Sequence, residues 1–244
     1  MAATTKPIPS VWARQQREAG QPALSRAAIV REAIAMLDAE GVEALSMRKL
    51  GARLNAGATS LYRHVANKDE LMELALDEVA GEIIVPATDG SDWRAAAVQT
   101  AGSFRATALR HPWLASVLGQ AGLAYLGPNM LSVSERLAAL FIKAGFPDPS
   151  GAIDAVLSYV MGMSTTEAAW LTTVARSGET EADFVARLLP AARQAAAGYD
   201  HLAGAYTTPP DADPAQIRDT KFANGLDIVL DGLATRLPRT GGQP

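Results

Sequence analysis

The sequence predicts an all-α protein in which a small N-terminal helix-turn-helix domain precedes a larger helical domain. Apolar residues recur at helical spacing in one segment after another, and Gly, Pro and short polar stretches separate these segments. We find no convincing strand and no short internal repeat. With 244 residues, of which 48% are apolar and 20% charged, the chain has ample core material for both domains.

The first predicted helix begins after Ser25, a residue type that caps helices, and Gly41 ends it. Ile29, Ala33 and Leu37 recur at helical spacing along its buried face. This helix opens the N-terminal domain. The predicted organisation is a flexible arm at residues 1–24, the helix-turn-helix domain at residues 25–85 and a larger helical domain at residues 86–244.

Two short helices follow, joined by the tight turn "NAGA" at residues 55–58. Asn and Gly tolerate the positive φ that a sharp reversal between helices needs. Ser46 caps the helix before the turn, and the helix after it is expected to be about two turns long. Leu61 and Val65 face inward from that third helix.

A fourth helix follows at once, with Asn67 as its cap and Glu70 three residues later, as in a capping box. We expect it to continue to about Val85, where Pro86 stops it. The rest of the chain also reads as helical. The expected helices are residues 93–110 with Asp92 as the cap, 127–145, 149–178, 181–198 with Pro190 as a kink or break, and 214–237, with a helix break at "HPW" (111–113) and a loop at 199–213.

Residues 46–65 have the geometry of a helix-turn-helix unit, whose second helix lies in the major groove of DNA. With Leu61 and Val65 inward, the polar residues of the third helix point outward. Arg63 can donate two hydrogen bonds to a guanine edge. The predicted DNA contacts are Ser46, Arg48, Lys49, Thr59, Ser60, Tyr62, Arg63, His64 and Lys68.

Three of these contacts have a simpler explanation beside the functional one. Arg63 could be an ordinary solvated surface residue, and His64 could be buried or could cap a helix. For Tyr62, a phosphate contact and packing against the second helix are equally plausible. The charge distribution favours DNA binding only weakly: residues 1–70 contain ten Lys and Arg against seven Asp and Glu, whereas the whole chain has a net charge of −4.

The segment from Ile29 to Leu71 closely resembles the DNA-binding domain of the tetracycline-repressor-like (TetR) family. The matching motifs are Glu40–Gly41, Ser46–Arg48, Leu61–His64 and Lys68–Leu71. One departure is Asn55, where the family usually has Gly. The remainder of the chain is similar, more loosely, to the all-helical C-terminal domain of the family.

The resemblance implies a homodimeric regulator, usually a repressor, that a small molecule bound in the C-terminal domain releases from a palindromic operator. It implies that the last helix and the helix over Asp154–Arg176 form the dimer interface, although their apolar stripes could equally be monomer core. The similarity also places His111 and Glu167 near positions that contact the ligand in the family. Together with soft, bulky side chains that are more often core than pocket, the candidate effector contacts are Phe104, His111, Trp113, Met130, Met163, Glu167 and Trp170.

Composition argues against several other classes of protein. With three His and no Cys, the chain shows no nucleophile–base arrangement, no zinc-ligand spacing and no phosphate-binding Gly loop, so we expect no enzyme, cofactor or metal site. It shows no signal peptide and no membrane-spanning run, which predicts a cytoplasmic protein, at the nucleoid when bound to DNA, without a membrane partner.

Two rival functions remain open. A ligand-independent activator or architectural DNA binder would share the motif but lack a cavity between the C-terminal helices. A helical enzyme or carrier with a vestigial first domain would bind operator DNA no better than random DNA.

Overall fold

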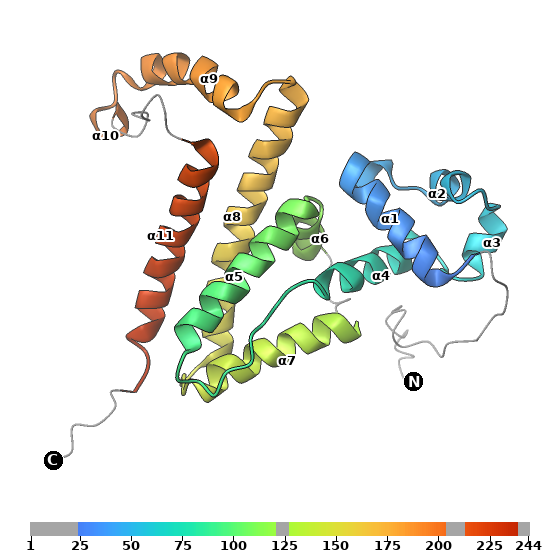
Figure 1. The fold of residues 1–244 in the computed structure, drawn as a ribbon, viewed down its shortest axis with the longest axis horizontal. Helices are drawn as coiled ribbons and strands as arrows, with labels where there is room; N and C mark the ends of the chain where they lie inside the picture. Colours follow the sequence, from blue (N-terminus) through green and yellow to red (C-terminus); the bar gives the residue numbers. More distant parts are fainter. Residues whose placement is uncertain (1–23, 121–126, 204–212, 239–244) are drawn as a thin grey trace, which may run out of the picture.

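The computed structural model describes residues 24–120, 127–203 and 213–238, and every regular element in these ranges is a helix (Figure 1). The predicted all-α fold is therefore confirmed for this part of the chain. The predicted arm at 1–24 lies outside the described residues, except for Leu24. The elements are α1 (Arg26–Glu40), the short 3₁₀ helix η2 (Val42–Ala44), α2 (Met47–Arg53), α3 (Ala58–Tyr62), α4 (Lys68–Ala80), α5 (Trp93–Arg110), α6 (Leu114–Gln120), α7 (Pro128–Lys143), α8 (Pro149–Ser177), α9 (Glu181–Ala196), α10 (Asp200–Ala203) and α11 (Pro214–Ala234).

Side-chain caps begin the helices of the N-terminal domain where the sequence predicts them. Ser25, Ser46 and Asn67 each accept a hydrogen bond from the backbone N–H three residues later, at 3.1, 3.2 and 2.8 Å. Each bond pairs an N–H that has no partner inside its helix. The cap of α5 differs, because Asp92 precedes the helix but its side chain makes no capping hydrogen bond.

Two boundaries in this domain differ from the prediction. Helix α3 has only five residues, although the N–H of Val65 still bonds to the carbonyl of Leu61 at 3.0 Å and adds a further turn. Helix α4 ends at Ala80 rather than near Val85. Gly81 ends α4, and Pro86 favours an extended conformation in the residue before it. Val85 is buried without being helical.

The segment between α4 and α5 runs along the C-terminal helices. The N–H of Ile84 donates to the hydroxyl of Ser103 on α5 at 2.8 Å. Gly90 has a φ of 100°, and a Cβ there would lie 2.2 Å from the carbonyl oxygen of Lys143. Only Gly fits this close approach of the segment to the end of α7.

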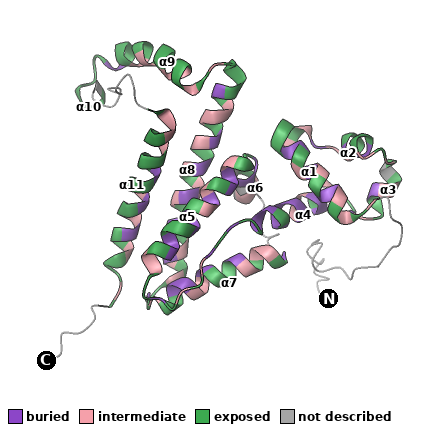
Figure 2. Cartoon of the chain, in the orientation of Figure 1, coloured by how far each residue is buried: buried purple, intermediate pink, exposed green. Residues whose placement is uncertain are grey.

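In the C-terminal domain, α8 is the central helix and packs against α5, α7 and α11. Its buried residues alternate with exposed ones at helical spacing, and Figure 2 shows the buried positions of α4, α5 and α8 facing the interior. Helix α4 packs against both α1 and α7, so it connects the two domains. Figure 1 shows α9 and α10 at one end of α8 and α11, away from the N-terminal helices.

Pro190, predicted as a kink or a break, lies inside α9 without ending it, so it is not a break. Two other details of this domain differ from the prediction. Part of the expected loop at 199–213 forms the short helix α10, and residues 204–212 lie outside the described ranges. Helix α11 ends at Ala234, a few residues before Pro238, where we expected it to end.

Candidate DNA-binding surface and ligand cavity

The turn between α2 and α3 is tight, and two residues make it possible. Asn55 has a φ of 49°, a left-handed conformation that Asn adopts more readily than most residues. The N–H of Ala56 donates to the carbonyl of Gly51 at 2.8 Å. A Cβ on Gly51 would lie only 2.8 Å from the carbonyl oxygen of Ala56, so the absence of a side chain there permits the reversal.

Helix α3 presents a polar face to solvent. Leu61 and Val65 are fully buried, and they fix which side of the helix faces outward. Thr59, Tyr62 and Arg63 are exposed, with Tyr62 at 50%. Ser60 and His64 are half-buried at the edge of this face. A short helix held by two apolar residues, with hydrogen-bonding side chains outward, has the form of a recognition helix.

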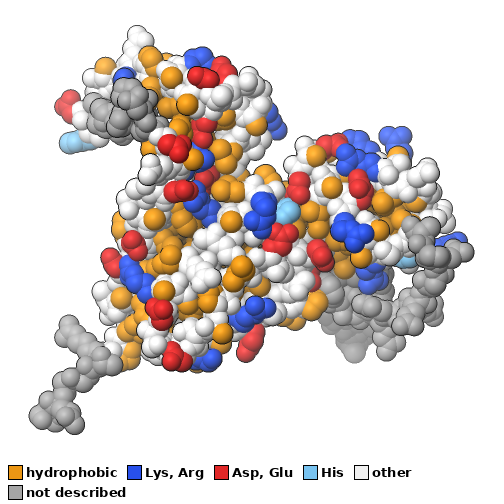
Figure 3. All heavy atoms as spheres, viewed as in Figure 1, with side chains coloured by type: hydrophobic (Ala, Val, Ile, Leu, Met, Phe, Trp, Pro, Cys, Tyr) orange, Lys and Arg blue, Asp and Glu red, His pale blue; other side chains and the backbone are white. Residues whose placement is uncertain are grey.

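The beginning of α2 adds basic groups beside this face. Arg48 and Lys49 are both exposed, and Figure 3 shows several Lys and Arg side chains on the N-terminal domain. The Lys49 ammonium lies 3.7 Å from the Glu40 carboxylate. Arg53 is paired with Glu32 and Glu40. Part of the positive charge of this surface is therefore already balanced within the domain.

Two further basic residues are anchored to the backbone. The Lys68 ammonium donates to the carbonyl of Val42 at 3.1 Å, so η2 holds it in place. The Arg26 Nε donates to the carbonyl of His64 at 3.3 Å and thus contacts the turn that follows α3. Arg26 is not among the predicted DNA contacts, and its only signal in the sequence is its position directly after the Ser25 cap.

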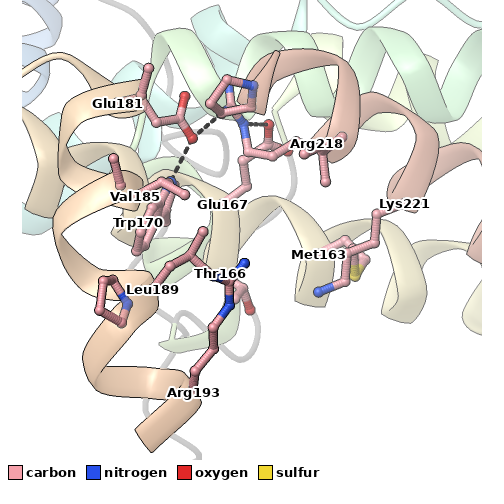
Figure 4. A pocket seen from close by; sticks show the side chains of 15 residues that line it. Met163, Thr166, Glu167, Trp170, Glu181, Val185, Leu189, Arg193, Arg218 and Lys221 are labelled. Carbon is pink, nitrogen blue, oxygen red and sulfur yellow. Dashed lines mark hydrogen bonds and ion pairs between the residues drawn. The ribbon is translucent and has the colours of Figure 1, made fainter. Parts of the chain in front are cut away.

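A second feature is an open cavity of about 610 Å³ between α8, α9 and α11 (Figure 4). This volume suits a small organic molecule. Most of its wall is apolar. Its lining comprises Met163, Thr166, Glu167, Trp170, Glu181, Ala182, Val185, Ala186, Leu189, Pro190, Arg193, Pro214, Ile217, Arg218 and Lys221.

A network of ion pairs forms one side of the cavity, as Figure 4 shows for part of it. The Glu167 carboxylate accepts hydrogen bonds from Arg105 on α5 at 2.6 Å and from Arg218 on α11 at 2.9 Å. Glu181 accepts from Arg218 and, at 2.6 Å, from the indole of Trp170. Glu181 is the first residue of α9, so the network ties α9 to α8 and α11.

Burial and hydrogen bonding act on the pKa of Glu167 in opposite directions. Removal from water would raise the pKa of this carboxyl, but the bonds from Arg105 and Arg218 outweigh that effect and lower it. The pKa of Arg218 is raised, because its bonds to the two carboxylates outweigh its own burial. The network is therefore ionised at neutral pH and leaves no unpaired charge among these groups.

The seven candidate effector contacts separate into four places. Met163, Glu167 and Trp170 line the cavity. Phe104 lines a second, very small void of about 10 Å³ between α5, α7 and α8. Met130 lies at the start of α7, where its N–H donates to Asp77.

The other two, His111 and Trp113, lie at the junction between the domains and not at the cavity. Both side chains bond to Asp38 on α1, at 2.8 and 2.7 Å.

The cavity residues of α9 and α11 were not predicted from the sequence. The spacing of Val185 and Leu189 on α9 was a signal that could have found them.

Within the described ranges, no three His, Asp or Glu side chains converge to form a metal site. None of the described helices is both long and apolar enough to cross a bilayer.

Comparison with known proteins agrees with both parts of the structure. Residues 29–75 match the family model "Bacterial regulatory proteins, tetR family", and residues 85–237 match "Tetracyclin repressor-like, C-terminal domain". The chain is 37% identical over 228 residues to an HTH-type transcriptional regulator of Saccharopolyspora erythraea, with 92% of this chain and 91% of that protein covered. It is 33% identical over 237 residues to the HTH-type transcriptional repressor DrrR1 of Streptomyces coeruleorubidus, with 94% and 84% covered.

Solved structures show the same architecture. The structure of the TetR family protein ActR of Streptomyces coelicolor in complex with actinorhodin has a TM-score of 0.68 and 30% sequence identity, covering 87% of this chain and 97% of that one. A helix-turn-helix domain joined to a helical domain of this kind defines a transcriptional regulator and not an enzyme. The chain belongs to the TetR family of bacterial regulatory proteins.

Proposed function

We propose that this regulator is a homodimeric repressor that binds a palindromic operator and leaves it when a small molecule binds the C-terminal domain. The observation that carries the proposal is the exposed polar face of α3, fixed outward by the buried Leu61 and Val65. Its DNA contacts are Ser46, Arg48, Lys49, Thr59, Ser60, Tyr62, Arg63, His64 and Lys68. In this role Lys68 would contact a phosphate while η2 anchors its ammonium.

A dimer through α8 and α11 is consistent with the exposed faces of these helices. The two helices pack against each other within the chain. Helix α11 leaves Ile228 73% exposed, and the outer face of α8 carries the small residues Ser158, Gly162 and Thr165. Small side chains allow a partner helix to approach closely. A twofold dimer would present two copies of α3 to two half-sites, which is why the operator should be palindromic.

The cavity between α8, α9 and α11 is the candidate effector site. Its volume and largely apolar wall fit a small molecule, and Met163, Glu167 and Trp170 line it. The relatives support the mechanism in outline: DrrR1 is named a repressor, and ActR was crystallised with actinorhodin. The polar groups on the wall would orient the effector.

The experiment that tests the function is selection of bound fragments from genomic DNA by the full-length protein, followed by footprinting. We expect one or a few palindromic sites, each protected by one dimer, and release from them by a compound found in a screen. Binding without any sequence preference would overturn the operator assignment. A specific site from which no compound releases the protein would instead favour a ligand-independent regulator.

A further inference from the structure

The wall of the cavity between α8, α9 and α11 carries more positive than negative charge. Its charged residues are the basic Arg193, Arg218 and Lys221 and the acidic Glu167 and Glu181. Behind the wall, Arg105 pairs with Asp219, and the formal charges of these two residues cancel. Counted by formal charge, the wall therefore has one positive charge in excess, in surroundings that are mostly apolar.

The two wall carboxylates are already used within the protein. Glu167 accepts hydrogen bonds from Arg105 and Arg218. Glu181 accepts from Arg218 and from the indole of Trp170. A cationic ligand that paired with either carboxylate would have to displace one of these donors, and removing a partner from a largely buried ion pair is costly. This side of the cavity therefore disfavours a cation.

Lys221 differs from the other polar groups of the wall. The hydroxyl of Thr166, for example, donates to the carbonyl of Gly162 at 2.9 Å. Within the part of the chain that the structure describes, the Lys221 ammonium has neither an ion pair nor a hydrogen bond. Figure 4 shows Lys221 and Met163 across the cavity from Trp170. The three donors of this ammonium are therefore available to a ligand, away from the ion-pair network.

The rest of the cavity suits the apolar part of such a ligand. Val185 and Leu189 line it from α9, and Ile217 lines it from α11. Arg193, also on α9, adds a second basic group, so that positive charge comes from two of the three helices. Apolar walls exclude water and thereby strengthen the attraction between these cations and an anion in the cavity.

We propose that the effector is an amphipathic anion, with an apolar body between α8 and α9 and a carboxylate or similar acidic group bound to Lys221. The ammonium donates hydrogen bonds to the acidic group, while the apolar walls cover the body of the molecule. A neutral analogue of the same shape binds more weakly, because it forms no charged hydrogen bond with Lys221. The effector role rests on the proposed function, whereas the preference of the cavity for an anion does not.

A second copy of the chain is the alternative partner of Lys221. Lys221 lies seven residues before Ile228, so helical spacing places both on one face of α11. The exposed Ile228 belongs to the face through which the proposed dimer forms. A carboxylate of the partner subunit at Lys221 would leave no anion site there, and the experiment has to separate the two cases.

Isothermal titration calorimetry of the full-length protein without DNA measures the preference. The probes are naphthoate, anthracenecarboxylate and dodecanoate, each compared with its own carboxamide, so that only the head group changes within a pair. We expect the acid of at least one pair to bind at least about fivefold more tightly than its amide, with a smaller difference at high salt. Acids that bind no better than their amides in every pair, or no binding by any probe, would overturn the proposal.

Three variants assign the preference to the cavity. Lys221→Gln, at an exposed position, should reduce the preference to about twofold or less. Arg236→Gln removes a charge from an exposed position just after α11 that does not line the cavity, and it should keep the full preference. Val185→Trp should weaken the binding of acid and amide alike. A preference for the acid that survives Lys221→Gln would overturn the proposal.

Two further measurements separate the remaining cases. Analytical ultracentrifugation shows whether Lys221→Gln weakens the dimer; a weaker dimer with an unchanged preference would assign Lys221 to the subunit interface and overturn the proposal. Release of operator DNA separates the ligand class from the proposed function. Acids that bind through Lys221 but release no DNA would contradict the effector role alone. Acid and amide that bind the cavity equally and both release DNA would contradict the ligand class alone.

Discussion

The carboxylate of Asp77 on α4 accepts a hydrogen bond, at 2.9 Å, from the backbone N–H of Met130 in the first turn of α7. The two residues are 53 positions apart in the sequence. Asp77 is buried, and a Cβ on Gly127 would lie 2.1 Å from its carboxylate oxygen. Helix α4, which connects the two domains, is therefore fixed to the C-terminal domain by a capping interaction that depends on one side chain.

Two substitutions of Asp77 should separate the contribution of its hydrogen bond to stability from the contribution of its charge. Asp77→Ala leaves the Met130 N–H without its partner and should lower the free energy of unfolding by about 1–3 kcal/mol. Asp77→Asn keeps an acceptor oxygen and removes the charge, so it should cost much less. Urea denaturation at neutral pH measures both, and equal losses in the two variants would contradict the capping role.

The same residue predicts a dependence of stability on pH. Burial raises the pKa of Asp77 above 3.8, although hydrogen bonds from the start of α7 oppose this effect. The folded state therefore binds the proton more tightly than the unfolded state, and this contribution is complete below pH 3.8 and is lost as pH rises through the raised pKa. Asp77→Asn has no titrating group at this position, so its stability lacks this contribution. Its stability relative to the unsubstituted protein should increase as pH rises through this window.

The turn of the helix-turn-helix unit also predicts an effect on stability. Asn55 has a φ of 49°, which β-branched residues adopt only with strain. Asn55→Val should destabilise the protein by about 1–3 kcal/mol, whereas Asn55→Gly should be within about 1 kcal/mol of the original. Thermal denaturation of the two variants measures this. A Val variant as stable as the Gly variant would mean that the turn adopts another conformation.

DNA recognition gives a further prediction. If Arg63 reads a base, Arg63→Ala should cost about 1–3 kcal/mol of discrimination between the operator and a site changed at that base. Titration of both DNAs by fluorescence anisotropy measures the difference. An equal loss on both would assign Arg63 to the phosphate backbone.

Lys68 is expected to contact a phosphate and not a base, in contrast to Arg63. Its ammonium is held beside the backbone of η2. Lys68→Ala should weaken binding to all sequences and reduce the slope of log affinity against log salt concentration by about one unit. An unchanged slope would remove Lys68 from the DNA contacts and leave its bond to Val42 as its role.

The ion-pair network predicts a further loss of stability. Glu167, Arg105 and Arg218 are mostly buried, with side chains 9%, 14% and 22% exposed. Glu167→Gln removes the charge that the two guanidinium groups share, but Arg105 keeps its pair with Asp219 and Arg218 keeps its pair with Glu181. The variant should therefore be destabilised by about 1–3 kcal/mol. Because the pKa of Glu167 is lowered in the folded state, its contribution should be lost as pH decreases through that pKa. Urea denaturation near neutral and acidic pH checks both effects, and a difference between the two proteins that does not shrink at acidic pH would contradict the assignment.

The sequence was informative where structure depends on neighbouring residues. Ser25, Ser46 and Asn67 cap their helices because a side chain reaches an N–H only three residues away. Asn55 could be assigned to a turn from its own conformational preference. Together with the helical spacing of apolar residues, these short-range effects were enough to predict the all-α fold and the inward face of α3.

The sequence was less informative where distant residues meet. The His111 ring finds Asp38 73 positions away, and no local pattern predicts that pairing. The end of α4 was misjudged for a related reason. Val85 is buried in an extended segment whose path depends on contacts with the C-terminal helices, so its apolar character did not mean that it was helical.

The cavity gives the last prediction, which concerns the effector. Val185 lines the cavity from α9 and makes no part of the ion-pair network. Val185→Trp should fill much of the space without removing a hydrogen bond, so the effector should bind at least about tenfold more weakly. Operator affinity without the effector should stay unchanged, because α9 lies far from α3.

Leu188→Trp is the matched control for this substitution. It places the same side chain three residues further along α9, at an exposed position that does not line the cavity. The measurement is release of labelled operator DNA by increasing effector concentration for the three proteins. If Val185→Trp responds like Leu188→Trp and the unsubstituted protein, the effector binds elsewhere in the C-terminal domain. The void beside Phe104 would then be the next place to test, since it could enlarge when a ligand enters between α5, α7 and α8.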